Sequence, residues 1–395
     1  MEAFYRTHKY LVTHLGTPVR RGLMDEVDWS RRLIGIKGCR EIGKTTFLLS
    51  YARERFPHDG HECLYVNLNN FIFTERTLTD FAGEFYANGG KVLLIDQIFK
   101  YPNWSRELRY CYDHFSNLRI VFTGSSVMRI KEENHEVGDI VTPYYLHGFS
   151  FREYLNLKAG LDLQPITFDM LMRDRDIIAR DIIDQVNPGE YFHDYLHHGF
   201  YPFFLEKRNY SENLLKMMNM TLEVDVLYIR QIEQRYLPKL RRLLYIISQN
   251  DSCTINISQL SKEIGTSRAT VMNYLKYLKD ARMITLLYPR GEEFPQKPVY
   301  ANLYNSNLLH VINRQTQDER TVNEAFFFNQ LMKDNRVNAY DRHNSFLVND
   351  RYLFRISYPE ARWKVNPDFY YAVNEVETPP DEPNCIPLWM FGFLY

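Results

Sequence analysis

One short segment constrains this chain more than any other, because it carries two glycines, a lysine and a threonine at a fixed spacing. Residues 38–45 read Gly-Cys-Arg-Glu-Ile-Gly-Lys-Thr, between an apolar run typical of a buried strand and a stretch typical of a helix. Backbone N–H groups of such a loop close around phosphate oxygens, Lys44 reaches the outer phosphates, and the Thr45 hydroxyl ligates Mg²⁺. A plain glycine turn is the alternative. The segment predicts that ATP with Mg²⁺ is bound by Gly38, Cys39, Arg40, Glu41, Ile42, Gly43, Lys44, Thr45 and Thr46.

The bulk composition limits where such a chain works and what it binds. At 395 residues it is too long for one ordinary core, and about two to four domains are expected. A formal net charge of −1 provides no global field toward nucleic acid, so any DNA contact depends on a local basic face. The five cysteines are scattered, which argues against a disulfide framework or a zinc site and favours the cytoplasm. No signal peptide and no run of roughly 18 apolar residues is visible, so we expect neither export nor a membrane span.

Short apolar strands alternate with helical stretches through residues 31–150. The expected strands are Arg32–Ile36, Cys63–Leu68, Val92–Ile95, Arg119–Thr123 and Tyr144–Leu146. Apolar runs without polar alternation are typical of strands buried on both faces, which predicts an α/β fold with a parallel sheet. Five regions are expected: an N-terminal helical segment (1–30), a phosphate-loop ATPase domain (31–150), a helical lid or connector (151–240), a winged helix (241–290) and a C-terminal α/β domain (291–395).

A strand-end carboxylate supplies the second half of the predicted nucleotide site. Asp96 ends an apolar strand, where phosphate-loop proteins hold the Mg²⁺ shell, so Thr45 and Asp96 are the expected metal-holding residues. In the hydrolytic branch of these proteins a Glu follows and polarises the attacking water, but this chain has Gln97, which cannot accept the proton. Loss of a general base costs about 10²–10⁴ in rate. Ser125, after the next strand, is a candidate to sense the outer phosphate.

Residues 257–278 have the pattern of a helix, a glycine-containing turn and a second helix, followed by a strand-like segment. This order is typical of a winged helix-turn-helix. In DNA-binding examples the start of the second helix enters the major groove, which makes Arg268 and Asn273, with Ser267 and Thr270, the candidate DNA contacts. Winged helices also serve as protein–protein modules. Because few basic residues lie on this helix, we expect at most weak, salt-sensitive DNA binding.

Several motifs follow one another in the order of a known family. They are the phosphate loop, Ile95-Asp96 followed by Lys100-Tyr101-Pro102-Asn103-Trp104, Thr123-Gly124-Ser125-Ser126, and Phe149-Ser150-Phe151-Arg152-Glu153-Tyr154-Leu155. With them the chain resembles the AAA-like bacterial and archaeal ATPases that carry a winged helix and a C-terminal PD-(D/E)xK nuclease-like domain of unknown function. The closing segment Ile386–Tyr395 is similar to the tail of Bacteroidales members. The resemblance implies ATP and Mg²⁺ as cofactors, and a homo-oligomer or a protein partner.

Two departures from the family pattern bear on hydrolysis. Family members usually read Asp-Glu-x-His where this chain has Asp96-Gln97-Ile98-Phe99. They also usually carry an Asp-Leu-Ser-Arg-Arg stretch with candidate arginine fingers, where residues 139–143 read Asp-Ile-Val-Thr-Pro. One such change is compatible with a laboratory substitution. The two together favour a natural relative of the family that binds ATP but hydrolyses it poorly.

The resemblance also implies where a nuclease site would lie in the C-terminal domain. Such a site needs carboxylates on neighbouring strands and a lysine. Glu324 stands where a family carboxylate is expected, but the two strand positions hold Ser345 and Arg355. Mg²⁺ needs oxygen ligands and Arg355 brings a positive charge instead, so we expect a folded interaction domain without nuclease activity. Arg355 and Lys364 are alternative candidates for phosphate binding.

Three functions are compatible with this sequence. The first is a nucleotide-regulated switch or scaffold that binds ATP and hydrolyses it weakly or not at all. The second is an active ATPase in DNA processing, with an unrecognised base or an arginine from a neighbouring subunit. The third is a DNA-binding regulator with a vestigial loop, against which the intact Lys44 and Thr45 argue. Gln97 and the missing arginines favour the first function over the second, and whether the chain is an enzyme stays open.

Overall fold

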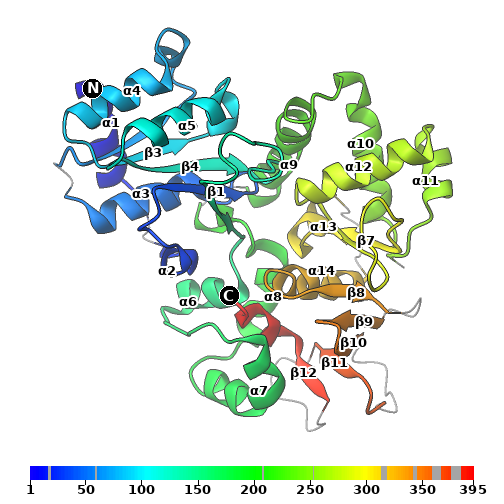
Figure 1. Ribbon diagram of the computed structural model, residues 1–395. Coiled ribbons are helices and arrows are strands. Elements are labelled where there is room, and N and C mark those ends of the chain that lie inside the picture. The colour runs from blue at the N-terminus through cyan, green and yellow to red at the C-terminus, as the bar shows by residue number, and fades with distance from the viewer. Residues whose placement is uncertain are drawn as a thin grey trace. The chain divides into compact units, whose positions relative to one another are not determined.

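The computed structural model of the protein describes residues 1–16, 19–57, 60–206, 209–251, 253–312, 318–340, 345–357, 366–374 and 384–395. These residues group into two compact units, Met1–His147 and Gly148–Tyr395 (Figure 1). The finer division into five regions stays a prediction within these two units.

The first unit is a parallel sheet flanked by helices. Its strands are β1 (Leu33–Gly38), β2 (Cys63–Asn67), β3 (Val92–Asp96), β4 (Arg119–Ser125) and β5 (Thr142–Leu146). Its helices are α1 (Glu2–Thr13), α2 (Leu23–Glu26), α3 (Lys44–Arg55), α4 (Leu78–Ala87) and α5 (Trp104–His114), with the 3₁₀ turns η1 (Phe71–Thr74) and η2 (Ile98–Lys100). The strands lie in the order β2-β3-β4-β1-β5, and each neighbouring pair is parallel. Figure 1 shows α3 on one face of the sheet and α4 and α5 on the other. The predicted α/β class is confirmed.

The register of this sheet brings the polar strand ends to one edge. All five residues of β3 are buried, as expected of a strand covered on both faces. β4 lies between β1 and β3, so one strand separates the strand that leads into the phosphate loop from the strand that ends in Asp96. Gly38 pairs in register with Ser125, and Asn67 pairs with Asp96. Ligands of open α/β sheets bind at this carboxyl edge, which positions the candidate site.

Helix α1 covers one edge of the sheet, at β2. β2 is an edge strand, and the outward N–H groups of an edge strand have no neighbouring strand to bond. His8 of α1 lies 4% exposed and its Nδ1 accepts the N–H of Tyr65 at 3.0 Å. An accepting Nδ1 places the ring proton on Nε2. The N-terminal helix therefore belongs to the first unit and holds β2 in place.

The second unit begins with helices and ends with a mixed sheet. Its α-helices are α6 (Phe151–Ala159), α7 (Phe168–Ile183), α8 (Gly189–His198), α9 (Tyr210–Met220), α10 (Leu237–Ser248), α11 (Ile257–Ile264), α12 (Arg268–Asp280), α13 (Ser306–Ile312) and α14 (Glu319–Leu331). Its other helical segments are η3 (Pro202–Leu205), η4 (Thr221–Tyr228, a π-helix), η5 (Gln234–Tyr236) and η6 (Leu388–Phe393). Its strands are β6 (Ile284–Leu287), β7 (Tyr300–Leu303), β8 (Val337–Ala339), β9 (Ser345–Val348), β10 (Tyr352–Ser357), β11 (Tyr370–Val373) and β12 (Cys385–Pro387).

Two sheets form in this unit. β6 and β7 pair antiparallel after α12. The other five strands lie in the order β12-β11-β10-β9-β8, with antiparallel pairing from β8 to β10 and parallel pairing from β10 to β12. Helix α14 packs on η6 and β10, and Thr321–Leu331 are all buried. The predicted C-terminal α/β region is confirmed as a mixed sheet with a buried helix.

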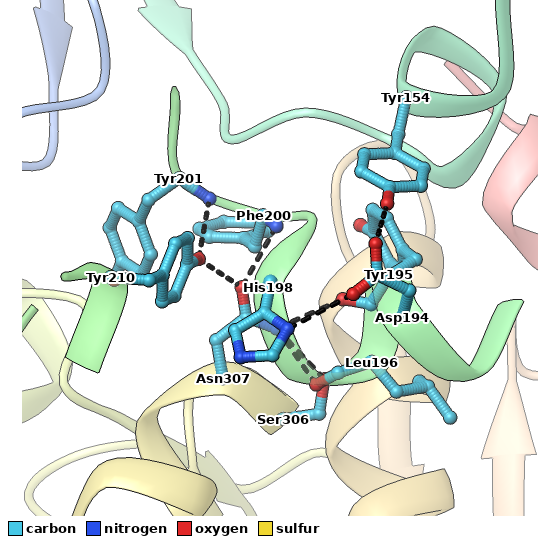
Figure 2. A network of polar contacts seen from close by, with 10 residues as sticks. All are labelled: Tyr154, Asp194, Tyr195, Leu196, His198, Phe200, Tyr201, Tyr210, Ser306 and Asn307. Carbon is cyan, nitrogen blue, oxygen red and sulfur yellow. Dashed lines mark hydrogen bonds and ion pairs between the residues drawn. The ribbon is translucent and has the colours of Figure 1, made fainter. Parts of the chain in front are cut away.

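A buried asparagine joins three helices of this unit (Figure 2). The side-chain oxygen of Asn307 on α13 accepts hydrogen bonds from the Tyr210 hydroxyl at 2.6 Å and the Phe200 N–H at 2.8 Å. Its Nδ2 donates to the carbonyls of Tyr195 and Leu196, at 3.1 and 2.8 Å. The last carbonyls of a helix lack helical donors; at the end of α8 the Tyr195 carbonyl also accepts the Gly199 N–H, and the Asn307 amide provides a donor to Leu196 and links α8 to α9 and α13.

Candidate nucleotide-binding site

The predicted phosphate loop connects β1 to α3. Gly43 directly precedes α3 with φ 95°, a backbone conformation that favours glycine, and a Cβ there would meet open space. At Gly38 a Cβ would lie 2.7 Å from the carbonyl oxygen of Leu146, so only glycine fits between the loop and β5. Glu41 also has a positive φ, of 56°. The loop therefore has the shape that its glycines predict, and the N-terminus of α3 adjoins it.

Two cations are held against the carbonyls of this loop. Lys44 Nζ donates to the carbonyl oxygens of Gly38 at 3.0 Å and Cys39 at 2.5 Å. Arg21, 7% exposed, donates to the carbonyls of Ile42 at 3.5 Å and His147 at 2.8 Å. Lys44 thus lies across the loop, while Arg21 ties the loop to the residue after β5.

The Asp96 carboxylate collects three hydroxyl donors. Its Oδ2 accepts from Thr45 Oγ1 at 2.6 Å and from the Tyr65 hydroxyl at 2.8 Å, and its Oδ1 accepts from Thr123 Oγ1. Asp96 is 1% exposed, whereas Thr45 is exposed. A hydroxyl and a carboxylate in contact at the mouth of a phosphate loop are the hard oxygen donors that Mg²⁺ prefers, so these residues fit the ion that the sequence predicts.

The residue at the expected general-base position has a defined environment. Gln97 has φ 60°, and its N–H donates to Thr123 Oγ1 at 2.9 Å. Its side-chain oxygen accepts from Asn69 Nδ2 at 2.9 Å. An amide oxygen held in this way can accept a hydrogen bond from water but cannot take up its proton. The Gln97 side chain is therefore chemically suited to binding a water molecule but not to acting as a general base.

Ser125 ends β4 in register with Gly38 and is 3% exposed. Its Oγ accepts the N–H of Val127 at 3.4 Å. The hydroxyl that contacts Asp96 belongs instead to Thr123, two residues earlier on the same strand. Ser125 thus lies at the level of the loop, and its role as a phosphate sensor stays a prediction.

Sequence reasoning missed two residues that the structure brings to this site, Tyr65 on β2 and Asn69 in the turn after it. No motif marks them, because their contacts with Asp96 and Gln97 depend on which strands are neighbours. Thr123 on β4 belongs to the quoted motif Thr123-Gly124-Ser125-Ser126, but its contact with Asp96 was not predicted. In the segment where finger arginines were expected, Asp139 accepts from Arg109 Nη1 at 3.1 Å.

The helix–turn–helix segment is built as its sequence predicts. The αL residue Gly265 ends α11, and the Ser267 hydroxyl accepts the Thr270 N–H at 3.1 Å to cap α12. Arg268 and Asn273 are both exposed on α12. The apolar side of the same helix is buried, at Val271, Tyr274, Leu275 and Leu278. The two candidate DNA contacts are accessible, while the rest of the helix packs against its own unit.

The positions of the expected nuclease carboxylates are engaged in other contacts. Ser345 and Arg355 pair in register across β9 and β10, and Arg355 Nε donates to Ser345 Oγ at 3.0 Å. The guanidinium of Arg355 lies 4.2 Å from the ring centroid of Phe369. Glu324 is 1% exposed, accepts from the Tyr300 hydroxyl at 2.8 Å, and burial raises its pKa to about 7. Lys364 lies outside the described residues.

Metal-binding clusters were sought in the same part of the chain. Among the described residues, no group of three or more His, Cys, Asp or Glu side chains has an arrangement that could hold a metal ion. The same residues include no helix with the length and hydropathy that a bilayer crossing requires.

A five-stranded parallel sheet, a phosphate loop after β1 and an aspartate at the end of β3 define the first unit as an ATPase-like nucleotide-binding domain. Comparison with protein families agrees: residues 30–155 match the family described as AAA domain. Residues 189–301 match a second family, described as Domain of unknown function (DUF8612). Each match covers less than half of the chain.

Two curated relatives come from the archaeon Methanocaldococcus jannaschii. The uncharacterized protein MJ1637 is 22% identical over 274 residues, which are 66% of this chain and 58% of the relative. The uncharacterized protein MJ1544 is 25% identical over 270 residues, which are 64% of this chain and 55% of the relative. The matched part of the chain thus spans less than three fifths of either relative. The expected bacterial origin stays a prediction.

Solved structures give only distant similarity. The Aeropyrum pernix ORC1 protein in complex with DNA matches at 10% identity and a TM-score of 0.31, covering 82% of this chain and 91% of that one. Domain III of the Thermotoga maritima replication initiation protein DnaA matches at 16% identity and a TM-score of 0.24, covering 47% and 86%. Similarity at these TM-scores establishes nothing further about this chain.

Proposed function

We propose that the chain binds ATP with Mg²⁺ at the phosphate loop, hydrolyses it slowly or not at all, and uses the nucleotide as a switch or scaffold signal in the cytoplasm. The observation that carries the proposal is the contact of Thr45 with Asp96 at 2.6 Å beside the open loop at Gly43. Loop N–H groups and Lys44 would hold the phosphates. Thr45 and Asp96 would hold the ion, which when bound neutralises phosphate charge.

Slow hydrolysis follows from the same site. Gln97 replaces the expected base, and its amide oxygen is held by Asn69 at 2.9 Å. Residues 139–143 contain no arginine that could act as a finger. Removal of a base costs about 10²–10⁴ in rate, and removal of an arginine finger costs about 10³–10⁵. A long-lived nucleotide complex is what a switch requires, because its two states must persist long enough for a partner to distinguish them.

The experiment is nucleotide binding and turnover measured on one preparation. ATP with Mg²⁺ should raise the melting temperature, because a ligand that binds only the folded state stabilises it. Turnover should stay well below about 1 s⁻¹, the low end of ordinary enzyme rates. No stabilisation by millimolar ATP would overturn the binding proposal, and turnover at or above that rate would overturn the slow-hydrolysis proposal.

A second candidate is an ATPase that acts on DNA. The exposed positions of Arg268 and Asn273 on α12, after a helix–turn–helix and before the β6–β7 pair, favour it. Against it, Lys276 and Lys279 of the same helix lie over the rings of Phe294 and Tyr288, so they are engaged within the unit.

Duplex DNA binding at two salt concentrations decides between these candidates. This helix presents few cations to neutralise DNA phosphates, so we expect it to bind duplex DNA weakly and to lose that binding at the higher salt concentration. Tight binding at physiological salt that is lost in Arg268→Ala, together with DNA-stimulated turnover, would favour the DNA-acting ATPase.

We further propose that the C-terminal sheet is an interaction domain without nuclease activity. DNA cleavage with Mg²⁺ or Mn²⁺ that disappears in Glu324→Ala would overturn this.

A further inference from the structure

The Asp96 carboxylate has one hydroxyl partner that no motif of the sequence assigns to the nucleotide site. Tyr65, on the neighbouring strand β2, donates its hydroxyl to Oδ2 at 2.8 Å, the same oxygen that Thr45 contacts at 2.6 Å. We propose that Tyr65 is a positioning residue for the Mg²⁺ site: it fixes the Asp96 carboxylate so that the site fits Mg²⁺ in particular. The inference rests on the proposed binding of ATP with Mg²⁺.

The hydrogen bonds of the carboxylate leave it little freedom. An ionised carboxylate offers about four acceptor sites. Thr45 and Tyr65 take two on Oδ2, and Thr123 takes one on Oδ1. About one site then remains, and a second would become available if Thr45 turned its hydroxyl toward an ion.

Tyr65 differs from Thr45 in how firmly it is held. Its side chain is 5% exposed, and its backbone N–H is bound to His8 of α1. The Thr45 side chain is exposed and can turn its hydroxyl toward an ion. When Thr45 turns, Tyr65 and Thr123 are the donors that still hold the Asp96 carboxylate.

Loss of this restraint should affect two ions differently. Mg²⁺ demands near-ideal octahedral geometry, whereas Ca²⁺ accepts variable geometry and ligand number. Removing a group that orients a metal ligand typically costs about 10–100-fold in metal affinity. A fixed carboxylate therefore matters more for Mg²⁺ than for Ca²⁺. A merely structural role for Tyr65, or a change in charge alone, would affect both ions alike.

The test is the thermal shift of the full chain in saturating ATP, titrated separately with Mg²⁺ and with Ca²⁺. Tyr65→Phe removes the hydroxyl and keeps the ring. Tyr101→Phe is the matched control, because the buried Tyr101 hydroxyl also donates to a carboxylate, that of Glu107, at 3.0 Å in the same unit. We expect Tyr65→Phe to raise the Mg²⁺ midpoint about tenfold and the Ca²⁺ midpoint clearly less. Tyr101→Phe should change neither midpoint.

Other outcomes separate this inference from the function on which it rests. If the parent shows no shift with ATP and Mg²⁺, the proposed function fails and the inference fails with it. If the parent shifts but Tyr65→Phe has an unchanged Mg²⁺ midpoint, a lowered one, or an equal rise for both ions, only the positioning role is overturned. A variant with 4-aminophenylalanine at position 65 keeps a donor and should have the parental midpoints. A raised Mg²⁺ midpoint in that variant would also contradict the role, even if Tyr65→Phe does not fold.

Discussion

The buried Glu324 of α14 should make the stability of the second unit depend on pH. Its carboxyl accepts from the Tyr300 hydroxyl at 2.8 Å and lies 3.8 Å from Arg320 Nε, at 1% exposure. Burial is the largest cause that raises its pKa from 4.5 to about 7. At about 1.4 kcal/mol for each pKa unit, ionisation of the folded form costs about 3 kcal/mol.

The direction of the effect follows from which state loses the proton first. Below pH 4.5 the carboxyl is protonated in the folded and the unfolded chain, and the carboxyl imposes no cost on folding. Between pH 4.5 and 7 the unfolded chain releases the proton while the folded chain keeps it, so stability falls as pH rises. Above pH 7 the folded chain carries the full cost. Glu324→Gln cannot ionise and should lack this loss.

The assay is urea unfolding at pH 5 and pH 8, followed through pulse-labelled amide exchange of α14. Between these pH values the parent should lose about 2–3 kcal/mol relative to Glu324→Gln. Glu319→Gln, an exposed change on the same helix, is the control and should follow the parent. Parallel pH profiles for parent and Glu324→Gln would refute the reasoning. A second result would also refute it: if Mg²⁺ alone at neutral pH stabilised the parent but not Glu324→Gln, an ion would be binding this carboxylate.

Two further predictions test the nucleotide site and the packing of the second unit. Gln97→Glu restores a base and should raise ATP turnover at least about tenfold in a phosphate-release assay; an unchanged rate would mean that the base position does not limit hydrolysis. Asn307→Leu leaves the buried Tyr210 hydroxyl, the Phe200 N–H and the Leu196 carbonyl without the partner that Asn307 provides, and should lower the unfolding free energy by about 2–4 kcal/mol in urea. A loss below about 0.5 kcal/mol would contradict the linking role assigned to this side chain.

Local patterns in the sequence were sufficient to predict the α/β class. The continuous apolar run of Val92–Ile95 predicts a strand buried on both faces, and β3 is fully buried. The predicted ends of strands were less accurate: β1 continues two residues past its predicted end at Ile36, as far as Gly38 in the loop. Hydrogen bonding to neighbouring strands, which the local sequence does not contain, decides where a strand ends.

The contacts around Asp96 show what the sequence does not reveal. Thr45 was expected beside Asp96 because the phosphate-loop motif implies it. The contacts of Tyr65 and Thr123 with Asp96 were not expected, although Thr123 lies in a quoted motif, because they depend on β2 and β4 being the two neighbours of β3. Asn307 is a further example, since it bonds to Phe200 across 107 positions of the chain. Such partners follow from the topology and register of the fold rather than from spacing.

The central claim is that the phosphate loop binds ATP with Mg²⁺ and that the chain hydrolyses it slowly or not at all. The most direct measurement is the ATP- and Mg²⁺-dependent shift of the melting temperature, together with phosphate release, for the parent and Lys44→Ala. Lys44 donates to the loop carbonyls of Gly38 and Cys39, and no other lysine occurs in residues 38–46. The parent should show a shift of several degrees with turnover well below about 1 s⁻¹, and Lys44→Ala should show no shift. An equal shift in both proteins, or none in the parent at millimolar ATP, would contradict the claim.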